Sequence, residues 1–281
     1  MTENFEQDKR LFEISQNTLT SQSRSLGSVY GMGQFKPTAI AVIPARWAST
    51  RFPGKPLAEI VGEPMIAHVV RRAAAARTIT EVVVATDDRR IAEASEAAGA
   101  VAVMTGACPS GTDRVAEAVI DRPGWDLVVN VQGDEPLLSA RNIDALVEGM
   151  ALAPQVAMGT LCRPLLAERH DDPNAVKVVR ALDGRALYFS RSAIPFRRGT
   201  AQPQESILLH LGIYAFTRAG LETFVGLEPS PLEKIESLEQ LRALENGMDI
   251  LVLDAIDDAI GVDTPQDLQR VEQMLVIQMK E

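Results

Sequence analysis

The chain has 281 residues, 46% of them hydrophobic and 23% charged, which excludes the disordered and fibrous classes and suffices to bury at least one full core. Its 28 basic and 38 acidic residues give a net charge of −10, which disfavours non-specific binding to nucleic acid or anionic lipid. No apolar run approaches the roughly 18 residues that cross a bilayer, and the two cysteines, Cys108 and Cys162, are too few for a disulfide framework, so we expect a cytoplasmic protein with no membrane insertion.

Residues 1–37 are rich in Ser, Thr, Gln and Asn and show no apolar periodicity. Such a segment cannot bury enough surface to offset the entropy of ordering. It lacks the apolar stretch of a signal peptide, and its acidic residues argue against a transit peptide. We therefore predict a disordered N-terminal tail over 1–37 and a folded domain over 38–281.

From residue 38 onward, short apolar runs alternate with helical patterns in the order typical of βαβ units. The expected strands cover 39–44, 81–85, 101–104, 127–131 and 156–160. The expected helices cover 65–76, with Pro64 as the first helical residue, then 88–98, 112–121 and 140–152. This alternation predicts an α/β fold with a doubly wound, mostly parallel, Rossmann-like sheet.

The alternation stops after residue 160. Residues 161–216 contain strand-like segments at 175–180, 186–189 and 207–216 with little helix between them. We predict that they form an inserted mixed-sheet second lobe. Helical segments and a strand at 250–253 then return the chain to the main sheet.

The loop after the first strand is the first candidate site, because ligands of such sheets bind beyond the carboxyl ends of the strands. It carries Arg46, Arg51 and Lys55 with no acid between them, and its backbone amides and cations can cradle phosphates. A P-loop is excluded because Pro56 follows Lys55, where that motif requires Ser or Thr. A Rossmann glycine fingerprint is excluded as well. The alternative is a solvated surface turn with incidental charges.

The strand at 127–131 leads into two adjacent carboxylates, Asp134 and Glu135. Mg²⁺ takes oxygen ligands, usually one or two carboxylates, and completes its coordination with phosphate and water. Asp134 is therefore a candidate magnesium ligand. The alternative is that one of the two acids caps the next helix, although Ser139 is the better-placed cap for a helix that starts at residue 140.

A further acid, Asp263, precedes the last helix. Thr264 can serve as the N-cap, Pro265 as the first helical residue and Asp267 as the reciprocal capping acid, so the cap is complete without Asp263. Asp134 and Asp263 can then form a split Mg²⁺ site at the ends of two strands. The alternative, an ordinary turn aspartate, stays open.

Two charged residues fall on the apolar side of the helical segment after Pro231. Ser230 and Glu233 form a capping box, which assigns Glu233 a structural role. Glu239 and Arg242 follow apolar residues at helical spacing, and inward-facing charges are costly unless they are paired or bind a ligand. They predict either an internal ion pair between Glu239 and Arg242 or a polar substrate pocket.

Several blocks, in the same order along the chain, strongly resemble the 3-deoxy-manno-octulosonate (Kdo) cytidylyltransferases. They are IPARWASTRFPGKPL (43–57), VNVQGDEP (129–136), PNAVKVV (173–179), ALYFSR (186–191), HLGIY (210–214), PSPLE (229–233), LEQLR (238–242) and GVDTP (261–265). The resemblance covers residues 38–276 and implies that 38–281 is a single cytoplasmic nucleotidyltransferase domain. It implies an Mg²⁺-dependent enzyme that joins CTP and Kdo into CMP-Kdo, releasing pyrophosphate and activating the sugar for lipopolysaccharide or capsule assembly. It also implies a homodimer, with residues 161–216 as the sugar-binding and dimerisation lobe.

The resemblance assigns roles to matching positions. The positions for the nucleotide are Ala45, Arg46, Arg51, Lys55, Ser110, Gly111, Thr112, Gln132 and Asp134. The positions for the sugar are Gln132, Arg191, His210, Tyr214, Glu239 and Gln240. The magnesium ligands correspond to Asp134 and Asp263, and the catalytic set to Arg46, Lys55, Asp134 and Asp263.

One departure from the family pattern concerns the sugar. Leu209 stands where the family generally has Lys or Arg before the HLGIY block. This departure makes a variant acceptor such as 8-amino-Kdo an alternative. Two further alternatives are a relative that acts on another acid sugar, such as sialic acid, and a catalytically silent nucleotide-binding module.

Overall fold

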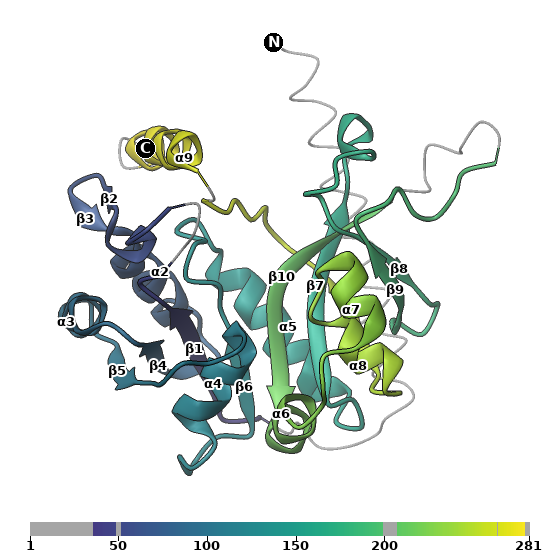
Figure 1. Ribbon diagram of the computed structural model, residues 1–281, viewed down its shortest axis with the longest axis horizontal. Helices are drawn as coiled ribbons and strands as arrows, with labels where there is room; N and C mark the ends of the chain where they lie inside the picture. Colours follow the sequence, from purple (N-terminus) through teal and green to yellow (C-terminus); the bar gives the residue numbers. More distant parts are fainter. Residues whose placement is uncertain (1–35, 49–51, 199–206, 263, 279–281) are drawn as a thin grey trace.

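The computed structural model describes residues 36–48, 52–198, 207–262 and 264–278 (Figure 1). Of the predicted N-terminal tail, only Lys36 and Pro37 lie within these ranges, so the prediction of disorder falls almost wholly outside them. In this part of the chain, no helix combines the length and the apolar character that crossing a bilayer requires.

A mixed sheet runs through the molecule in the strand order β11-β7-β10-β6-β1-β4-β5. In chain order its strands are β1 (Ala39–Ala45), β4 (Ile79–Thr86), β5 (Val101–Met104), β6 (Leu127–Asn130), β7 (Met158–Pro164), β10 (Leu208–Thr217) and β11 (Ile250–Asp254). β1 pairs in parallel with β4 and β6, and β4 pairs in parallel with β5. The predicted doubly wound α/β fold is confirmed.

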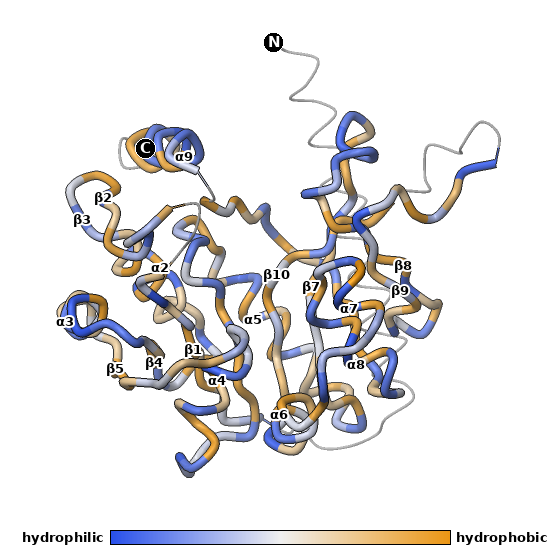
Figure 2. The backbone as a smooth tube through the Cα atoms, in the orientation of Figure 1, coloured by the Kyte–Doolittle hydropathy of each residue, from blue (hydrophilic) through white to orange (hydrophobic). Residues whose placement is uncertain are grey.

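Helices cover both faces of this sheet (Figure 1). The first core contains apolar residues of α2 (Met65–Ala74), α3 (Arg89–Ala97) and α5 (Ala140–Leu152). The second contains those of α4 (Gly111–Val119), α6 (Arg218–Val225) and α8 (Leu241–Glu245), and α7 (Pro231–Glu236) precedes α8. Apolar residues line the central strands, whereas the helices alternate between apolar and hydrophilic residues (Figure 2). Burial of one face of each helix therefore holds the layers together.

The strand expected at 207–216 belongs to both parts of the molecule. Its carboxyl-terminal half lies in the main sheet as β10, antiparallel to β6 and β7, and its first residues pair with β8 (Lys177–Arg180). β9 (Ala186–Ser190) extends the branch by pairing with β8. The second lobe is thus a continuation of β10 rather than a separate sheet, because a ten-residue strand is long enough to span both.

The chain crosses the carboxyl edge of the sheet between β11 and the last helix, α9 (Pro265–Gln278) (Figure 1). The crossing segment is tied to α5 by Asn142, whose Oδ1 accepts from the backbone N–H groups of Ile256 and Asp257 at 2.8 and 3.0 Å. α9 packs on the hairpin of β2 (Glu59–Ile60) and β3 (Glu63–Pro64). Two 3₁₀ turns cover Lys55–Leu57 and Ala167–Arg169.

Several element boundaries were predictable from local signals. The predicted strand 101–104 and helix 140–152 match β5 and α5 end to end. Ser139 caps α5 as expected, accepting from the Arg141 backbone N–H at 3.2 Å. The prediction that Pro64 is the first residue of α2 is wrong: Pro64 pairs with Glu59 in the hairpin and α2 begins at Met65.

Candidate active site

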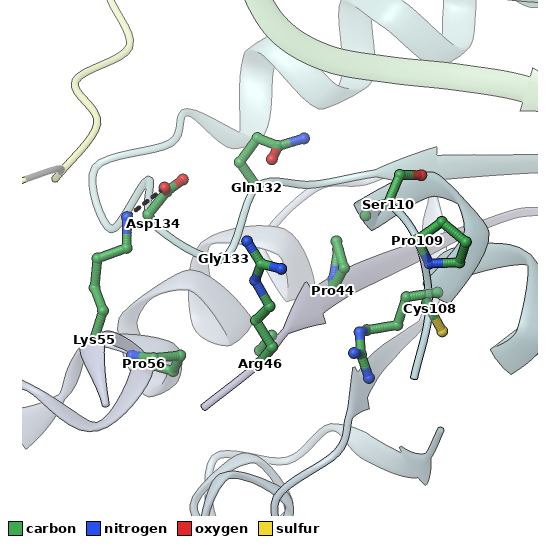
Figure 3. Close-up of a pocket in the computed structure, with 13 residues that line it drawn as sticks. Pro44, Arg46, Lys55, Pro56, Cys108, Pro109, Ser110, Gln132, Gly133 and Asp134 are labelled. Carbon is green, nitrogen blue, oxygen red and sulfur yellow. Dashed lines mark hydrogen bonds and ion pairs between the residues drawn. The ribbon is translucent and has the colours of Figure 1, made fainter. Parts of the chain in front are cut away.

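A pocket of about 350 Å³ opens at the carboxyl edge of the sheet (Figure 3). Its walls are the loops after β1, β5 and β6, together with the start of the 3₁₀ turn that contains Lys55. The lining residues are Pro44, Ala45, Arg46, Lys55, Pro56, Cys108, Pro109, Ser110, Gly111, Arg114, Gln132, Gly133 and Asp134. The fold therefore brings together seven of the nine predicted nucleotide positions from three separate loops; Thr112 does not line the pocket, and Arg51 is not among the described residues.

The predicted phosphate-binding loop bends back at Gly54. Its φ of 70° lies in the left-handed region, which favours glycine, and a Cβ there would lie 2.8 Å from the Trp47 ring. The Gly54 backbone N–H donates to the Trp47 carbonyl at 3.1 Å. This bend places Lys55 at one end of the pocket, with the exposed Arg46 between Lys55 and Ser110 (Figure 3). Arg51, the third predicted cation, lies outside the described residues.

Lys55 occupies a small cation site. Its Nζ lies 2.6 Å from Asp134 Oδ2 and donates to the Val262 carbonyl at 2.8 Å. The Val262 backbone N–H in turn donates to the Asp134 carbonyl at 2.8 Å. Two segments that are far apart in the sequence therefore meet at this ammonium group.

The second predicted magnesium ligand, Asp263, lies outside the described residues, but its neighbours are described. Val262 is bonded to Asp134 as above, and on the other side Thr264 caps α9 as predicted. The Thr264 backbone N–H donates to Asp267 Oδ2 at 2.9 Å, and the Asp267 N–H donates to Thr264 Oγ1 at 3.2 Å. The prediction that this cap is complete without Asp263 is confirmed.

The donor set around Asp134 fits a hard cation such as Mg²⁺. The Asp134 carboxylate and the Val262 carbonyl are oxygen ligands that already hold one cation, the Lys55 ammonium. Among the described residues, no three His, Cys, Asp or Glu side chains gather into a metal cluster. A divalent ion held here would thus depend on few carboxylates and on oxygen atoms of a bound phosphate.

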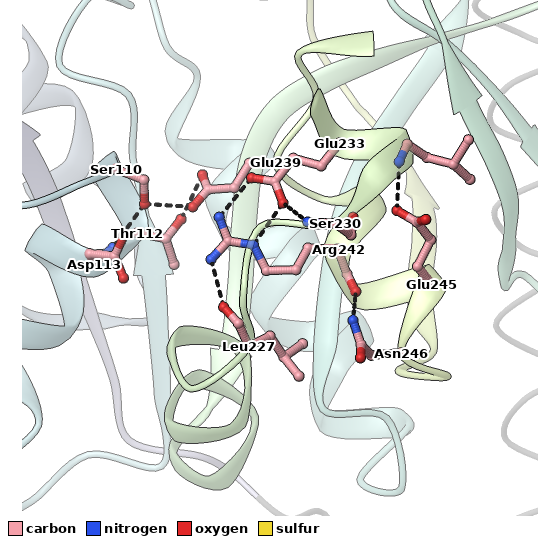
Figure 4. Close-up of polar contacts among 11 residues, drawn as sticks. Ser110, Thr112, Asp113, Leu227, Ser230, Glu233, Glu239, Arg242, Glu245 and Asn246 are labelled. Carbon is pink, nitrogen blue, oxygen red and sulfur yellow. Dashed lines mark hydrogen bonds and ion pairs between the residues drawn. The ribbon is translucent and has the colours of Figure 1, made fainter. Parts of the chain in front are cut away.

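The loop that resembles the cytosine-binding segment forms the opposite end of the pocket. Ser110 caps α4, accepting from the Asp113 backbone N–H at 3.1 Å. The Ser110 hydroxyl donates to Glu239 Oε1 at 2.6 Å, and Thr112 donates to Glu239 Oε2 at 3.1 Å (Figure 4). Burial raises the pKa of Glu239, while these two hydrogen bonds act to lower it. Glu239 therefore joins the nucleotide loop to the region where the sugar is predicted to bind.

His210 and Tyr214 form an aromatic pair on β10. Their ring centroids are 5.4 Å apart, and Phe189 packs edge-on against His210 at 5.0 Å. Burial lowers the pKa of His210 to about 3, so this imidazole is neutral near pH 7. Burial, and then the charge of Glu239, raise the pKa of Tyr214 well above its usual value. Thr160 Oγ1 lies 3.0 Å from His210 Nε2 and orients the ring.

Gln132 connects these groups to the pocket, and Gln240 follows Glu239 in the chain. Gln132 lines the pocket, and its Cγ would lie 3.7 Å from a Cβ at Gly212, the β10 residue between His210 and Tyr214. Gln240 is 3% exposed, and its Nε2 has no hydrogen-bond partner among the described residues. A buried donor of this kind is costly unless a ligand satisfies it.

Arg191 lies at the end of β9 and is held by backbone carbonyls. Its guanidinium donates to the carbonyls of Pro173, Glu236 and Ser237 at 2.7 to 3.2 Å. Lys177, which is fully buried, donates to the carbonyl of Arg191 at 2.6 Å. Arg191 thus links β9 to the turn that precedes Glu239 and Gln240.

Of the two alternatives predicted for Glu239 and Arg242, the ion pair between them is wrong. Arg242 pairs with Glu233 instead, at 2.6 Å from Nη2 to Oε1 and 2.9 Å from Nε to Oε2 (Figure 4). The reason is that α7 ends at Glu236 and is followed by Ser237 in the left-handed conformation, at φ 51°, so Glu239 and Arg242 do not continue one helix. Glu233 retains its predicted capping role, accepting from the Ser230 backbone N–H at 3.0 Å.

Replacing Arg242 with methionine should lower the free energy of unfolding by about 3–5 kcal/mol, because it leaves the Glu233 carboxylate buried without its charged partner. The two side chains are only 6% and 13% exposed. Urea denaturation measures the effect. The matched control is Arg89→Met, which removes an ion pair that is 86% and 65% exposed and should cost less than about 1 kcal/mol. Equal losses of unfolding free energy in the two variants would contradict the conclusion that Arg242 and Glu233 form a buried ion pair.

Leu209 faces away from the predicted sugar positions. It is 7% exposed and belongs to the first core, whereas His210 and Tyr214 lie on the opposite side of β10 against Phe189 and the second core. A leucine here therefore fills the core and removes no cation from the His210 and Tyr214 cluster.

Two pocket features were not assigned a role from the sequence. Arg114, 4% exposed, contributes a buried cation to the lining. Its position one turn after Ser110 was the sequence feature that could have indicated this role. Gly133 permits close packing of two strand ends, since a Cβ there would lie 3.0 Å from the Pro44 carbonyl oxygen. A glycine directly after a buried strand is the sequence signal for such an approach.

Comparison with known proteins supports the resemblance. A family model described as cytidylyltransferase matches residues 40–250. The chain is 52% identical over 235 residues to the 3-deoxy-manno-octulosonate cytidylyltransferase of Anaeromyxobacter sp. (strain Fw109-5), covering 83% of this chain and 95% of that protein. It is 50% identical over 237 residues to the protein of the same name from Myxococcus xanthus (strain DK1622), covering 84% and 96%. The solved structure of CMP:2-keto-3-deoxy-manno-octonic acid synthetase complexed with CTP matches with a TM-score of 0.81 at 42% identity, covering 86% of this chain and 99% of that one.

Proposed function

Because this chain belongs to the 3-deoxy-manno-octulosonate cytidylyltransferase family, we propose that it transfers CMP from CTP to the anomeric hydroxyl of Kdo, forming CMP-Kdo and pyrophosphate. The activated sugar then serves lipopolysaccharide or capsule assembly. The observation that carries the proposal is the continuity of the site: Glu239 bonds the nucleotide loop at Ser110, and Gln132 reaches from the pocket to β10.

The cationic end of the pocket suits the triphosphate. Arg46 and Lys55 line it, Arg114 lines the wall formed by α4, and Asp134 is the only acid among the described lining residues. Phosphoryl-type transfer asks a protein mainly to position its substrates and to neutralise charge. In this proposal Arg46 and Lys55 bind the phosphates, with Arg51 beside them, and Ser110, Gly111 and Thr112 lie against the cytosine.

The neutral, buried end suits a polyhydroxylated sugar. His210 is uncharged near pH 7 and the Gln240 Nε2 donor is unsatisfied within the described part of the chain, so both can bond sugar hydroxyls. Tyr214 and Glu239 lie beside them. Arg191 supports the segment that carries Glu239 and Gln240, which agrees with its predicted place in the sugar site.

We propose Asp134 and Asp263 as the residues that hold magnesium. The oxygen atoms around the Lys55 ammonium fit such an ion, as described above. When bound, Mg²⁺ would lower the pKa of the attacking hydroxyl and neutralise phosphate charge.

The reaction follows from these placements. The anomeric hydroxyl of Kdo gives up its proton to water as its oxygen attacks the α-phosphorus of CTP in line. The bond from the α-phosphorus to the bridging oxygen breaks, and pyrophosphate leaves with that electron pair. Glu239 and Gln132 hold the sugar toward the nucleotide, which converts a bimolecular encounter into a positioned one. Lys55 and Arg46 offset the charge that develops on the departing pyrophosphate.

We also propose a homodimer formed through the second lobe, in the cytoplasm. Leu187 on β9, Leu182, Phe196 and Ile235 are large apolar side chains that are 61%, 110%, 88% and 76% exposed, and such side chains favour a protein interface. The free thiols Cys108 and Cys162 suit a reducing compartment. Light scattering after size exclusion would test the dimer.

The proposed function is tested by a pyrophosphate-release assay with CTP, Mg²⁺ and one of Kdo, 8-amino-Kdo or sialic acid, with the product identified by mass. We expect turnover with Kdo. Turnover with 8-amino-Kdo or sialic acid alone would keep the fold and the chemistry but change the acceptor. A folded protein that binds CTP and turns over none of these sugars would identify a silent nucleotide-binding module.

A further inference from the structure

We propose that Asp87 is a positioning residue for CTP: it does not line the pocket, but its carboxylate ties two of the pocket walls together. This inference rests on the proposed function, because it concerns how tightly CTP is held.

Asp87 follows β4, and its two carboxylate oxygens bond different parts of the site. Oδ1 accepts from the Trp47 backbone N–H at 3.2 Å, directly after Arg46 in the phosphate-binding loop. Oδ2 accepts from Arg114 Nη2 at 3.0 Å, on α4. One carboxylate therefore fixes the distance between the loop proposed to bind phosphate and the helix that follows the proposed cytosine loop.

The hydrogen bond from Trp47 to Asp87 also affects the position of Lys55, through Gly54. The Arg90 guanidinium lies 3.5 Å from the centre of the Trp47 ring and covers it. The same ring lies so close to Gly54 that even a Cβ would collide with it, and the Trp47 carbonyl accepts the Gly54 N–H. A shift of Trp47 would therefore shift Gly54 and the Lys55 that follows.

The contact with Arg114 holds the other wall. Arg114 is 4% exposed, and besides Asp87 its guanidinium bonds the Thr105 hydroxyl. A buried guanidinium that loses its carboxylate partner must find another or move. Neutralising Asp87 would thus disturb both walls without removing any group that lines the pocket.

The test is Asp87→Asn, which keeps the size of the side chain and removes its charge. We expect the Kd of CTP, measured by calorimetry, and the KM of CTP to rise about 10- to 100-fold, the range for a lost supporting contact behind a binding group. The KM of Kdo should change less than about three-fold, since among the described residues no hydrogen bond joins Asp87 to His210 or Glu239.

The matched control is Asp144→Asn. Asp144 is 5% exposed and also accepts from a backbone N–H, that of Thr78 at 2.9 Å, and from an arginine, Arg77, at 3.2 Å, but it lies on α5 outside the pocket. The Asp144→Asn protein should be less stable than the wild type but should bind CTP with the same affinity. A second variant, Trp47→Phe, removes the part of the ring that contacts Gly54 and should weaken CTP binding as Asp87→Asn does. It replaces Asp87→Asn in the test if the Asp87→Asn protein folds poorly.

The outcomes separate the two proposals. Unchanged CTP affinity in Asp87→Asn, or equal weakening by Asp87→Asn and Asp144→Asn, would overturn the role of Asp87 and leave the proposed function standing. Wild-type protein that binds no CTP would overturn both.

Discussion

Replacing Asp134 with asparagine should lower kcat/KM by at least about 1000-fold while the protein stays folded. The physical reason is that the metal ion proposed to bind at Asp134 would supply several kcal/mol of charge stabilisation, and about 1.4 kcal/mol corresponds to a factor of ten. The asparagine side chain has the same size, so the neighbouring backbone bond from Val262 to the Asp134 carbonyl is retained. Steady-state pyrophosphate release at varied Mg²⁺ measures the effect.

The control for this prediction is Asp258→Asn. Asp258 lies on the segment that crosses to α9 and pairs with Arg163, but it is 69% exposed and outside the pocket. Its loss should leave kcat/KM within about two-fold, as expected for an exposed pair. Activity of Asp134→Asn within ten-fold of the wild type would show that the proposed metal site lies elsewhere.

Replacing Lys55 with glutamine should lower kcat/KM for CTP by about 100- to 1000-fold, the usual cost of removing one positioned group that stabilises developing charge. Because Lys55 lies at the phosphate end of the pocket, the KM of Kdo should change little. Initial rates at varied CTP and at varied Kdo separate the two effects.

The same variant tests the cation site in a second way. The Lys55 ammonium holds Asp134 Oδ2 and the Val262 carbonyl. Removing it should strengthen Mn²⁺ binding in the absence of nucleotide, measured by paramagnetic resonance, because two like charges no longer compete for one carboxylate. Lys234→Gln, at an exposed position on α7, is the control. Weaker Mn²⁺ binding in Lys55→Gln would contradict the competition.

Asp134→Asn and Lys55→Gln together test how the pocket is organised before substrates bind. Lys55 and Asp134 neutralise each other at 2.6 Å, and Gly54, Trp47 and Val262 fix the ammonium in place. The triphosphate and its metal ion would then enter a site whose charged groups are already arranged, which lowers the cost of ordering them on binding.

Much of the fold was predictable because its signals are local. Helix α5 begins after Ser139 and α9 after Thr264, in each case with the predicted cap. The βαβ alternation up to β7 was likewise visible in periodicity. The turn at Ser237 was missed: its left-handed conformation at φ 51° has no glycine to mark it, so Glu239 and Arg242 were read as one helix.

The site was predictable in part. The phosphate-binding loop and Asp134 follow strands, and parallel strands end at one edge of a sheet, so their meeting could be expected. The partners of Glu239 could not, because Ser110 is 129 residues away. The contacts of Asp87 were invisible for the same reason, since it precedes a helix and looks like an ordinary turn residue.

By itself the sequence determined the α/β alternation, the helix caps and the cationic loop, because each depends on residues a few positions apart. Only the tertiary structure decided that β10 enters the main sheet between β6 and β7, that Glu239 bonds Ser110, and that Lys55 is held between Asp134 and Val262. Strand order decides which distant loops meet. It cannot be inferred from periodicity, because the spacing of apolar residues along a strand is the same whichever strand it pairs with.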